Sequence, residues 1–190
     1  MCCRYLFSVH PADIRARELL ERMARSHPGE YKTGEIFPGD PAVAVLGEAG
    51  RLRLAPAVFG FPGFSGKGLL LNARAETAEE KPAFAEAFRA RRAVLPADGF
   101  FEWTHDGNKT KYLFVPASGG TLYLCGLWWR TEEGIRFVIL TRSANASLAG
   151  VHDRMPVTVP GEAVRDYLTD LSAARALARR EGPPLEKLPT

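Results

Sequence analysis

Gly99-Phe100-Phe101-Glu102-Trp103 is a short stretch of strand-forming residues interrupted by one carboxylate, and similar stretches lie on both sides of it. Aromatic and β-branched residues favour strands, and turn pairs such as Asp106-Gly107 favour hairpins. Further strands are expected at Ala93 to Leu95, Tyr112 to Val115, Leu122 to Trp128, Arg136 to Thr141 and Val157 to Val159. Many short strands at close spacing predict a strongly bent sheet.

The remainder of the chain adds more strands and a few helices. Strands are expected at Cys3 to Phe7, Ala42 to Leu46, Leu52 to Val58 and Leu69 to Leu71. Helical spacing follows Pro11 and Asp13 and recurs at Pro82 to Arg91, Glu162 to Leu168 and Ser172 to Arg180. Tyr31 to Asp40 is expected to be a loop, and the Pro- and charge-rich Glu181 to Thr190 a loose tail.

These elements predict an α+β fold with a curved, barrel-like, mostly antiparallel β core and a few peripheral helices. Regular β-α-β alternation is missing from the pattern, which argues against a parallel doubly wound sheet. The sequence shows neither a repeat nor a linker between Cys2 and Leu168. We therefore expect one domain over residues 1–190, with a core at about 2–168 and a C-terminal helix and loose tail at 169–190.

Composition is that of an ordinary soluble protein. The chain has 190 residues, of which 46% are hydrophobic and 25% charged, and its net charge is +3. No apolar run has the length of a membrane span, and the N-terminus does not have the pattern of a secretory signal. Three cysteines, two of them adjacent, do not make a disulfide framework. A reducing, cytoplasmic location is expected, and nothing demands more than a monomer.

The N-terminal Met1-Cys2-Cys3-Arg4 offers unusual chemistry if Met1 is removed. Cys2 would then carry an α-amine next to its thiol. The amine forms an imine with an aldehyde, and the thiol then closes a five-membered thiazolidine ring. The α-amino pKa of about 7.7–8.0 leaves a useful neutral fraction at neutral pH. The alternative is an inert residue at a frayed terminus.

Polar residues stand where apolar strands end, and each has a structural alternative. Glu102 is flanked by aromatic residues, so burial would raise its pKa and allow proton transfer near neutral pH, although it could also face solvent. His152 titrates near neutral pH, but a loop histidine often only bonds to backbone. Asn72 could orient an amine or cap a turn, and Arg74 could bind phosphate or pair with Glu76.

Other common sites are not indicated. The spacing of cysteine and histidine does not fit a zinc site, and neither a phosphate-binding loop nor a dinucleotide fingerprint is present. Cys125 lies in an apolar strand and is expected in the core. We expect neither a metal nor a cofactor.

Five motifs together resemble one family, the SOS response-associated peptidase (SRAP) domain proteins, over Cys2 to about Leu168. Their order and spacing also match those of the family. The motifs are Met1-Cys2 followed by Arg4-Tyr5, Phe37-Pro38-Gly39-Asp40, Asn72-Ala73-Arg74-Ala75-Glu76-Thr77, Gly99-Phe100-Phe101-Glu102-Trp103 and His152-Asp153-Arg154-Met155-Pro156.

The resemblance implies an α+β fold around a barrel-like core and covalent capture of abasic sites in single-stranded DNA. It implies that Cys2 is the nucleophile, that Asn72 orients the amine and the aldehyde, and that Glu102 and His152 transfer protons. DNA-binding roles fall on Arg4, Pro38, Gly39, Phe59 or another aromatic up to Phe64, Arg74, Lys81, Thr141 and Arg154. Association with the nucleoid is expected when the protein is bound to DNA, and self-processing by a peptidase activity would expose Cys2.

Two departures from the family pattern stand out. Cys3 replaces the usual Gly, and Phe59-Gly60 replaces the usual Trp-Gly. Two other functions remain open on sequence alone. One is a thiol peptidase that pairs Cys2 with His152. The other is a module that binds single-stranded nucleic acid without covalent capture.

Overall fold

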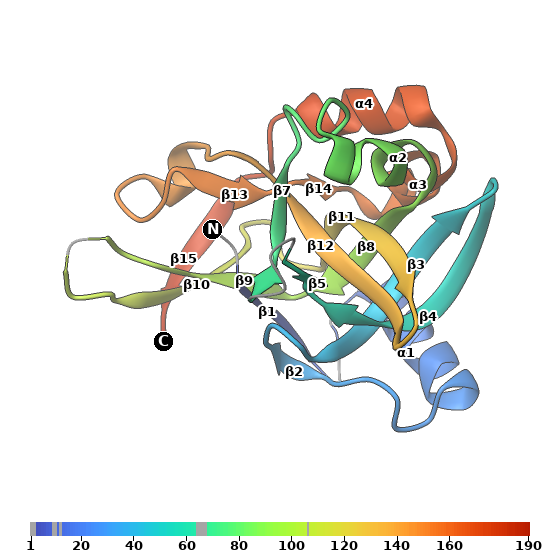
Figure 1. Ribbon diagram of the computed structural model, residues 1–190. Helices are drawn as coiled ribbons and strands as arrows, with labels where there is room; N and C mark the ends of the chain where they lie inside the picture. The colour runs from blue at the N-terminus through green and yellow to red at the C-terminus, as the bar shows by residue number, and fades with distance from the viewer. Residues whose placement is uncertain (1–2, 9–10, 12, 64–67, 106) are drawn as a thin grey trace.

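A computed structural model describes residues 3–8, 11, 13–63, 68–105 and 107–190. The helices and strands, with short 3₁₀ turns η1 and η2, follow one another along the chain (Figure 1). They are β1 (Arg4–Phe7), α1 (Ile14–Ser26), β2 (Gly34–Ile36), β3 (Pro41–Glu48), β4 (Arg51–Phe59), β5 (Phe61–Pro62), β6 (Leu69–Leu70), β7 (Asn72–Arg74), α2 (Pro82–Ala90), β8 (Arg92–Ala97), β9 (Gly99–Trp103), β10 (Lys111–Pro116), β11 (Leu122–Thr131), β12 (Gly134–Ser143), η1 (Ala146–Leu148), β13 (Arg154–Pro156), β14 (Thr158–Val159), η2 (Gly161–Ala163), α3 (Val164–Thr169), α4 (Leu171–Arg179) and β15 (Leu185–Pro189).

The larger sheet closes on itself. β12 pairs with β4, and the order continues through β3, β8 and β11 back to β12. Among the described strand pairs, those of β12 with β4 and with β7 are parallel and the others are antiparallel. The prediction of a barrel-like, mostly antiparallel core in an α+β fold is therefore confirmed.

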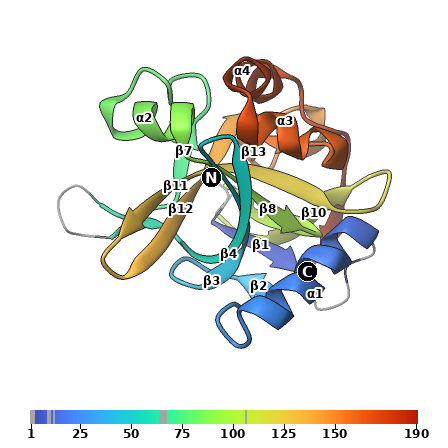
Figure 2. The same cartoon turned by 90° about the vertical axis from the view of Figure 1, so that its right-hand side faces the viewer.

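Three of the barrel strands, β3, β8 and β11, are buried on both faces over most of their length, which explains their continuous apolar sequences. In β11, Leu124 and Trp128 point into one core cluster, while Cys125 and Leu127 belong to a second cluster. The first cluster fills the barrel and the space towards α1. The second lies under α2, α3 and α4, which gather together while α1 lies apart from them (Figures 1 and 2).

A buried arginine joins the helices of this second layer. Arg92, at the start of β8, is 4% exposed and donates to the carbonyls of Phe88, Arg89, Tyr167 and Leu168 at 2.6–3.1 Å. These carbonyls lie in the last turns of α2 and α3, where the helices leave carbonyl groups without internal partners. One guanidinium thus holds two helix ends against the barrel.

A second sheet lies beside the barrel and contains β1 and β15, the first and last strands of the described chain. Its order is β15-β10-β9-β1-β2. β1 pairs with β9 so that Arg4 lies opposite Phe101 and Tyr5 opposite Phe100. Tyr5 and Phe7 alternate with less buried residues and are each 1% exposed, so one face of β1 is packed into the core.

Three sequence expectations need correction. The expected loop from Tyr31 to Asp40 contains β2, which pairs with β1. The first helix begins at Ile14, because Asp13 is its N-cap and accepts from the Ala16 N–H at 3.1 Å. The expected loose tail contains β15, which pairs with β10 along its length. Short edge strands held mainly by backbone hydrogen bonds give little apolar pattern in the sequence.

Leu185 anchors this last strand, so its truncation tests the corrected assignment. Leu185 is 9% exposed and its N–H donates to Ser147 Oγ at 2.9 Å. Leu185→Ala should lower the free energy of unfolding by about 2 kcal/mol, since truncating buried leucine removes packing. Chemical denaturation measures this change. The neighbouring Glu186→Ala, at an exposed position of the same strand, should stay within about 0.5 kcal/mol of wild type. Equal, small effects of both variants would contradict a packed β15.

Candidate active site

Glu102 lies in β9, which is paired on both sides. β10 places Tyr112 opposite Glu102, and β1 places Arg4 opposite the preceding residue. Glu102 is 2% exposed, and burial raises its pKa to about 7. The cause is the loss of hydration that a carboxylate suffers inside a protein. Near neutral pH this group is present in both forms and can both donate and accept protons.

The first described residue of the chain lies against this carboxylate. Extending the pairing of β1 with β9 by one residue brings Cys3 opposite Glu102. Burial and the nearby Glu102 carboxylate both raise the pKa of the Cys3 thiol. Cys2, the expected nucleophile, lies outside the described residues, and a single peptide bond joins it to Cys3.

His152 precedes β13 and has a defined tautomer. Its Nδ1 accepts the backbone N–H of Arg154 at 2.9 Å and also lies 2.9 Å from Asp153 Oδ1. A nitrogen that accepts an N–H has no hydrogen to donate to a carboxylate. Burial lowers the pKa of His152, which favours the neutral ring. We therefore assign the neutral form with hydrogen on Nε2 and regard the contact with Asp153, whose side chain is 88% exposed, as secondary.

The segment before β13 belongs to the same site as Glu102. Burial is the main cause of the raised pKa of Glu102, and the negative charge of the Asp153 carboxylate raises it further. The β9–β10 hairpin and the segment that leads into β13 project from the same side of the molecule (Figure 1). Glu102, Cys3 and the His152 segment are thus gathered from three separate parts of the chain.

Arg154 ties this segment to the barrel. Its Nη1 and Nη2 donate to the Glu76 carboxylate at 2.7 and 2.8 Å, and Nη2 also donates to the Thr141 carbonyl at 2.7 Å. The hydrogen bond from Arg154 lowers the pKa of Glu76 to about 2. Since both terminal nitrogens are engaged, the observed role of Arg154 is structural, and phosphate binding by it stays a prediction.

Asn72 and Arg74 lie on β7, which runs alongside β12. Asn72 lies opposite Ile139 and Arg74 opposite Thr141. Asn72 is half-buried, whereas Arg74 is exposed, as is Lys81 ahead of α2. Thr141 is fully buried, and its carbonyl accepts from Ala75 and Arg154. The expectation that Thr141 contacts DNA does not fit this burial. Thr141 instead supports Arg154 through its backbone carbonyl.

Arg4 is held beside aromatic rings at the start of β1. Its guanidinium carbon lies 4.4 Å from the centre of the Phe37 ring and 5.0 Å from that of Trp103. Lys111 of β10 lies 3.9 Å above the Phe101 ring. Arg4 and Lys111 both donate to Glu35, at 3.4 and 2.9 Å. The two cations thus stand over aromatic faces, an arrangement that also suits bases and phosphates.

Pro38 and Gly39 form an exposed turn next to Phe37. The Phe37 N–H donates to Asp40 Oδ2 at 2.9 Å, and the Gly39 N–H donates to the Phe59 carbonyl at 2.8 Å. Gly39 has a φ of 90°, a conformation that glycine adopts without strain. The turn is therefore rigidly presented to solvent.

Phe59 does not have the exposure that base stacking needs. It is 0% exposed, stacks on Phe137 with ring centres 5.1 Å apart and contacts Tyr5 edge-on at 6.0 Å. The expectation that Phe59 contacts a base is therefore corrected to a core role with a carbonyl that supports Gly39. Phe61 packs on Trp129 at 4.9 Å, and Phe64 lies outside the described residues.

Sequence reasoning did not select His105, which lies beside His152. Their ring centres are 4.9 Å apart with the planes at 62°. His105 belongs to the turn between β9 and β10, far from His152 in sequence. A histidine pair formed by two distant loops leaves no local pattern that could have identified it.

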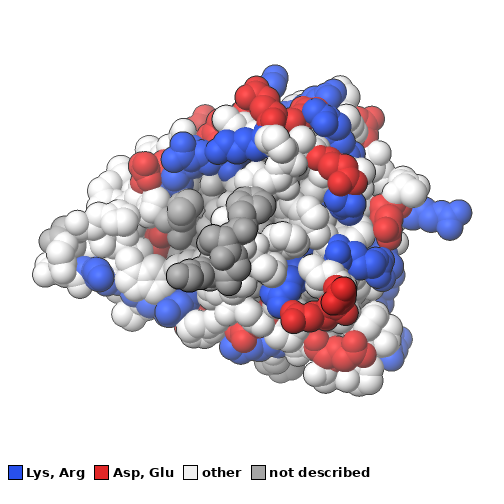
Figure 3. Space-filling model, viewed as in Figure 1, with Lys and Arg blue, Asp and Glu red and all other residues white. Residues whose placement is uncertain are grey.

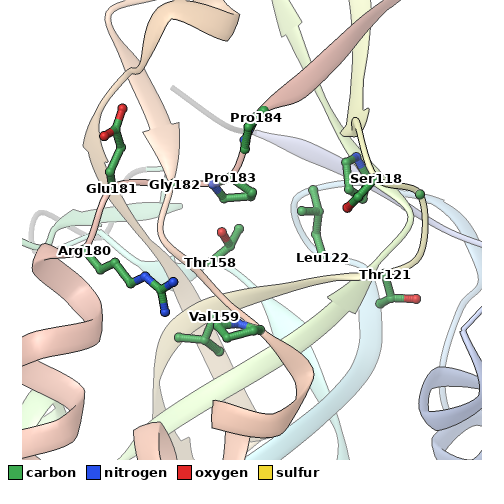
Figure 4. Close-up of a pocket in the computed structure, with 13 residues that line it drawn as sticks. Ser118, Thr121, Leu122, Thr158, Val159, Arg180, Glu181, Gly182, Pro183 and Pro184 are labelled. Atoms are coloured by element: carbon green, nitrogen blue, oxygen red, sulfur yellow. The ribbon is translucent and has the colours of Figure 1, made fainter.

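A separate hollow, of about 430 Å³, lies away from these residues. It is bounded by the turn between β10 and β11, by β14 and by the connection from α4 to β15, with Arg180 and Thr158 among its lining residues (Figure 4). None of the predicted site residues lines it.

In the described part of the chain, no three His, Cys, Asp or Glu side chains are arranged to hold a metal ion. No helix formed by the described residues is long and apolar enough to cross a membrane.

Comparison with known proteins adds an independent line of evidence. A family model described as SOS response associated peptidase (SRAP) matches residues 1–186. The abasic site processing protein YedK of Escherichia coli is 31% identical over 176 residues, which are 88% of this chain and 79% of the relative. YoaM of Bacillus subtilis, which bears the same description, is 30% identical over 153 residues, or 74% and 67% of the two chains. A crystal structure of a Bordetella bronchiseptica protein matches with a TM-score of 0.75 at 22% identity, covering 100% of this chain and 99% of that one.

The raised pKa of Glu102 predicts how the free energy of unfolding depends on pH. The pKa in the fold is about 7 against an ordinary 4.5, so folding favours the protonated form. Below pH 4.5 the carboxyl is protonated in both states. As the pH rises from 4.5 through 7, wild type should lose about 1–3 kcal/mol of unfolding free energy relative to Glu102→Gln. Chemical denaturation across this range measures the difference, and Glu102→Leu should remove the same dependence. If the free energy of unfolding changed with pH in the same way for wild type and both variants, the raised pKa of Glu102 would be contradicted.

Proposed function

The chain belongs to the SOS response associated peptidase (SRAP) family, and from this we propose that it binds single-stranded DNA and captures abasic sites covalently through Cys2. Relatives described as abasic site processing proteins support a role on DNA lesions. The crosslink would be a thiazolidine formed after Met1 is removed, either by an aminopeptidase or by self-processing. Such an adduct would shield a lesion that is otherwise prone to strand cleavage.

One observation carries this proposal. Cys3, the first described residue, precedes the strand that pairs with β9 beside the buried Glu102, and the His152 ring lies 4.9 Å from that of His105 in the hairpin that follows Glu102. A nucleophile at residue 2 would therefore act next to a group that holds or releases a proton near neutral pH. A cysteine at a frayed, isolated terminus would lack this setting.

The proposed reaction proceeds in three steps, which are addition of the amine, loss of water and ring closure by the thiol. First, the neutral Cys2 amine adds to the aldehyde of the ring-opened sugar, and its proton moves to the oxygen to give a carbinolamine. Second, a proton from Glu102 or His152 joins the departing hydroxyl, the C–O bond breaks and water leaves. The nitrogen then loses a proton to a base, which leaves a neutral imine. Third, the Cys2 sulfur bonds to the imine carbon and its proton passes to the nitrogen. The sum consumes aminothiol and aldehyde and releases one water.

Asn72 would orient the amine and the aldehyde oxygen, since its amide both donates and accepts hydrogen bonds. It is half-buried at the start of β7, beside the strand that also anchors Arg154. Processing of an N-terminally extended form would use the same carboxyl and imidazole, which is how a peptidase function fits the site.

DNA would be held by a small number of contacts. Arg4 beside Phe37 and Trp103 suits a phosphate next to an unstacked base, and the exposed Pro38-Gly39 turn lies beside Phe37. Arg74 and Lys81 are exposed and would contact phosphates further along. Positive and negative side chains are interspersed over the face in Figure 3, consistent with local contacts rather than one uniform basic surface. The protein would therefore bind single strands with moderate salt dependence.

Intact-mass analysis tests the proposal directly. Purified protein should lack Met1 and, after exposure to a single-stranded abasic oligonucleotide, gain the oligonucleotide mass less one water. Cys2→Ala should abolish this product. Cys3→Ala is the matched control at the adjoining cysteine and should retain it. An adduct that persists in Cys2→Ala would overturn the assignment of the nucleophile. Salt-sensitive binding without any adduct would instead favour a non-covalent module.

A second experiment addresses the proton-transfer groups. Glu102→Gln should slow adduct formation about 100-fold, because a general acid–base group typically contributes 10²–10⁴-fold. Single-turnover rates on a denaturing gel measure this. Glu186→Gln, at an exposed position of β15, is the control and should react at the wild-type rate. A Glu102→Gln rate within a factor of two of wild type would remove Glu102 from the mechanism.

A further inference from the structure

The histidine that the sequence analysis did not select lies in direct contact with the proposed proton-transfer group. The His105 and His152 ring centres are 4.9 Å apart, with the planes at 62°. This separation is within the range of direct edge-to-face contact, about 4.5–7 Å. The two rings also line one shallow hollow of about 560 Å³, together with Gly150, Val151 and Asp153.

The two histidines differ in their access to water. The side chain of His152 is only 9% exposed, whereas His105 is exposed. Since the Arg154 N–H occupies Nδ1 of His152, the exchangeable hydrogen of the neutral ring is on Nε2. A buried imidazole that takes part in repeated proton transfer needs a route to solvent, and His105 stands at the solvent side of this contact.

The position of His105 is fixed by the base of its hairpin. The Thr104 N–H donates to the Thr110 carbonyl at 3.0 Å, and the Thr110 N–H donates to Thr104 Oγ1 at 3.0 Å. Thr104 is 8% exposed, so the residue immediately before His105 is buried and bonded. His105 is therefore held where the paired strands end, and its place beside His152 is built into the fold.

We propose that His105 is a positioning residue for His152, which sets the charge state of that ring and passes protons between it and solvent during abasic-site capture. The proposal rests on the function proposed above. In each transfer His152 gives its Nε2 hydrogen to the departing hydroxyl and His105 delivers a proton from solvent to the vacated Nε2, so that both rings return to their starting forms and Nδ1 keeps its bond with the Arg154 N–H. His105 itself would not touch the sugar.

Other charged groups also act on the pair. His152 experiences Asp153, His105 and Arg154, and Asp153 in turn acts on Glu102. Glu102 also faces Cys3 at the chain start. Among these neighbours, His105 acts to lower the pKa of His152, whereas Asp153 acts to raise it. Loss of His105 should therefore raise the pKa of His152 and delay its deprotonation to higher pH.

NMR titration of the histidine rings in the free protein gives the first test, because it does not depend on the reaction. In His105→Gln, the His152 midpoint should move to higher pH. His27→Gln, which removes a histidine at the end of α1, is the matched control and should leave the midpoint unchanged. An unchanged His152 midpoint in His105→Gln would overturn the proposal. Thermal unfolding verifies that both variants fold.

Adduct formation gives the second test. His105→Gln should lower the single-turnover rate about five-fold, a fraction of the 10²–10⁴ that a direct general acid–base group contributes. The acidic limb of its pH–rate profile should shift upward, and added imidazole should restore the rate. If His105 had only a structural role, His105→Gln would lower the rate without shifting the pH–rate profile, and added imidazole would not restore the rate. That result would overturn the relay. A wild-type protein that forms no adduct would refute the proposed function and with it the relay, while the titration would still report whether the rings interact.

Discussion

The antiparallel register between β1 and β9 is the constraint on which the candidate site depends. Tyr5 and Phe7 are each 1% exposed on one face of β1. A slip of one residue would turn both rings out of the core, so the register is strongly specified by packing. Continued by one residue beyond Arg4 and Phe101, the same register would bring Cys3 opposite Glu102. The hydrophobic core, rather than any contact within the site, therefore holds Cys3 near the carboxyl.

Stability and reactivity pull in opposite directions at Glu102. Its burial raises the pKa to about 7, so the ionised form is disfavoured in the folded protein. The surrounding structure offsets this cost with strands that are packed on both faces, as β11 and β12 are. Arg92 contributes in another way, because it gathers the carbonyls of two helix ends into a buried set of hydrogen bonds. A rigid barrel thus tolerates a carboxyl that is useful because it is poorly solvated.

Sequence reasoning succeeded where local pattern and packing agree. Short apolar strands predicted the barrel, whereas the sequence left Glu102 either buried or facing solvent, and the structure shows that it is buried. It failed for β2 and β15, because edge strands are held by backbone bonds that leave no side-chain pattern. It also misplaced Phe59, which is fully buried, because an aromatic residue beside glycine has the same local sequence pattern on a surface loop as in a core. The contact of His105 with His152 joins two distant loops and could only come from the fold.

The tautomer of His152 depends on an ion pair that the proposed reaction does not use. The Arg154 N–H fixes Nδ1 of His152, and the Arg154 side chain is fixed in turn by Glu76 and the Thr141 carbonyl. Because Arg154 lowers the pKa of Glu76 to about 2, the pair persists above that range and weakens only in strong acid. Glu102, whose pKa is about 7, changes protonation at much higher pH. The support for the imidazole therefore stays charged while Glu102 titrates, so Nδ1 of the neutral His152 ring keeps its hydrogen-bond partner.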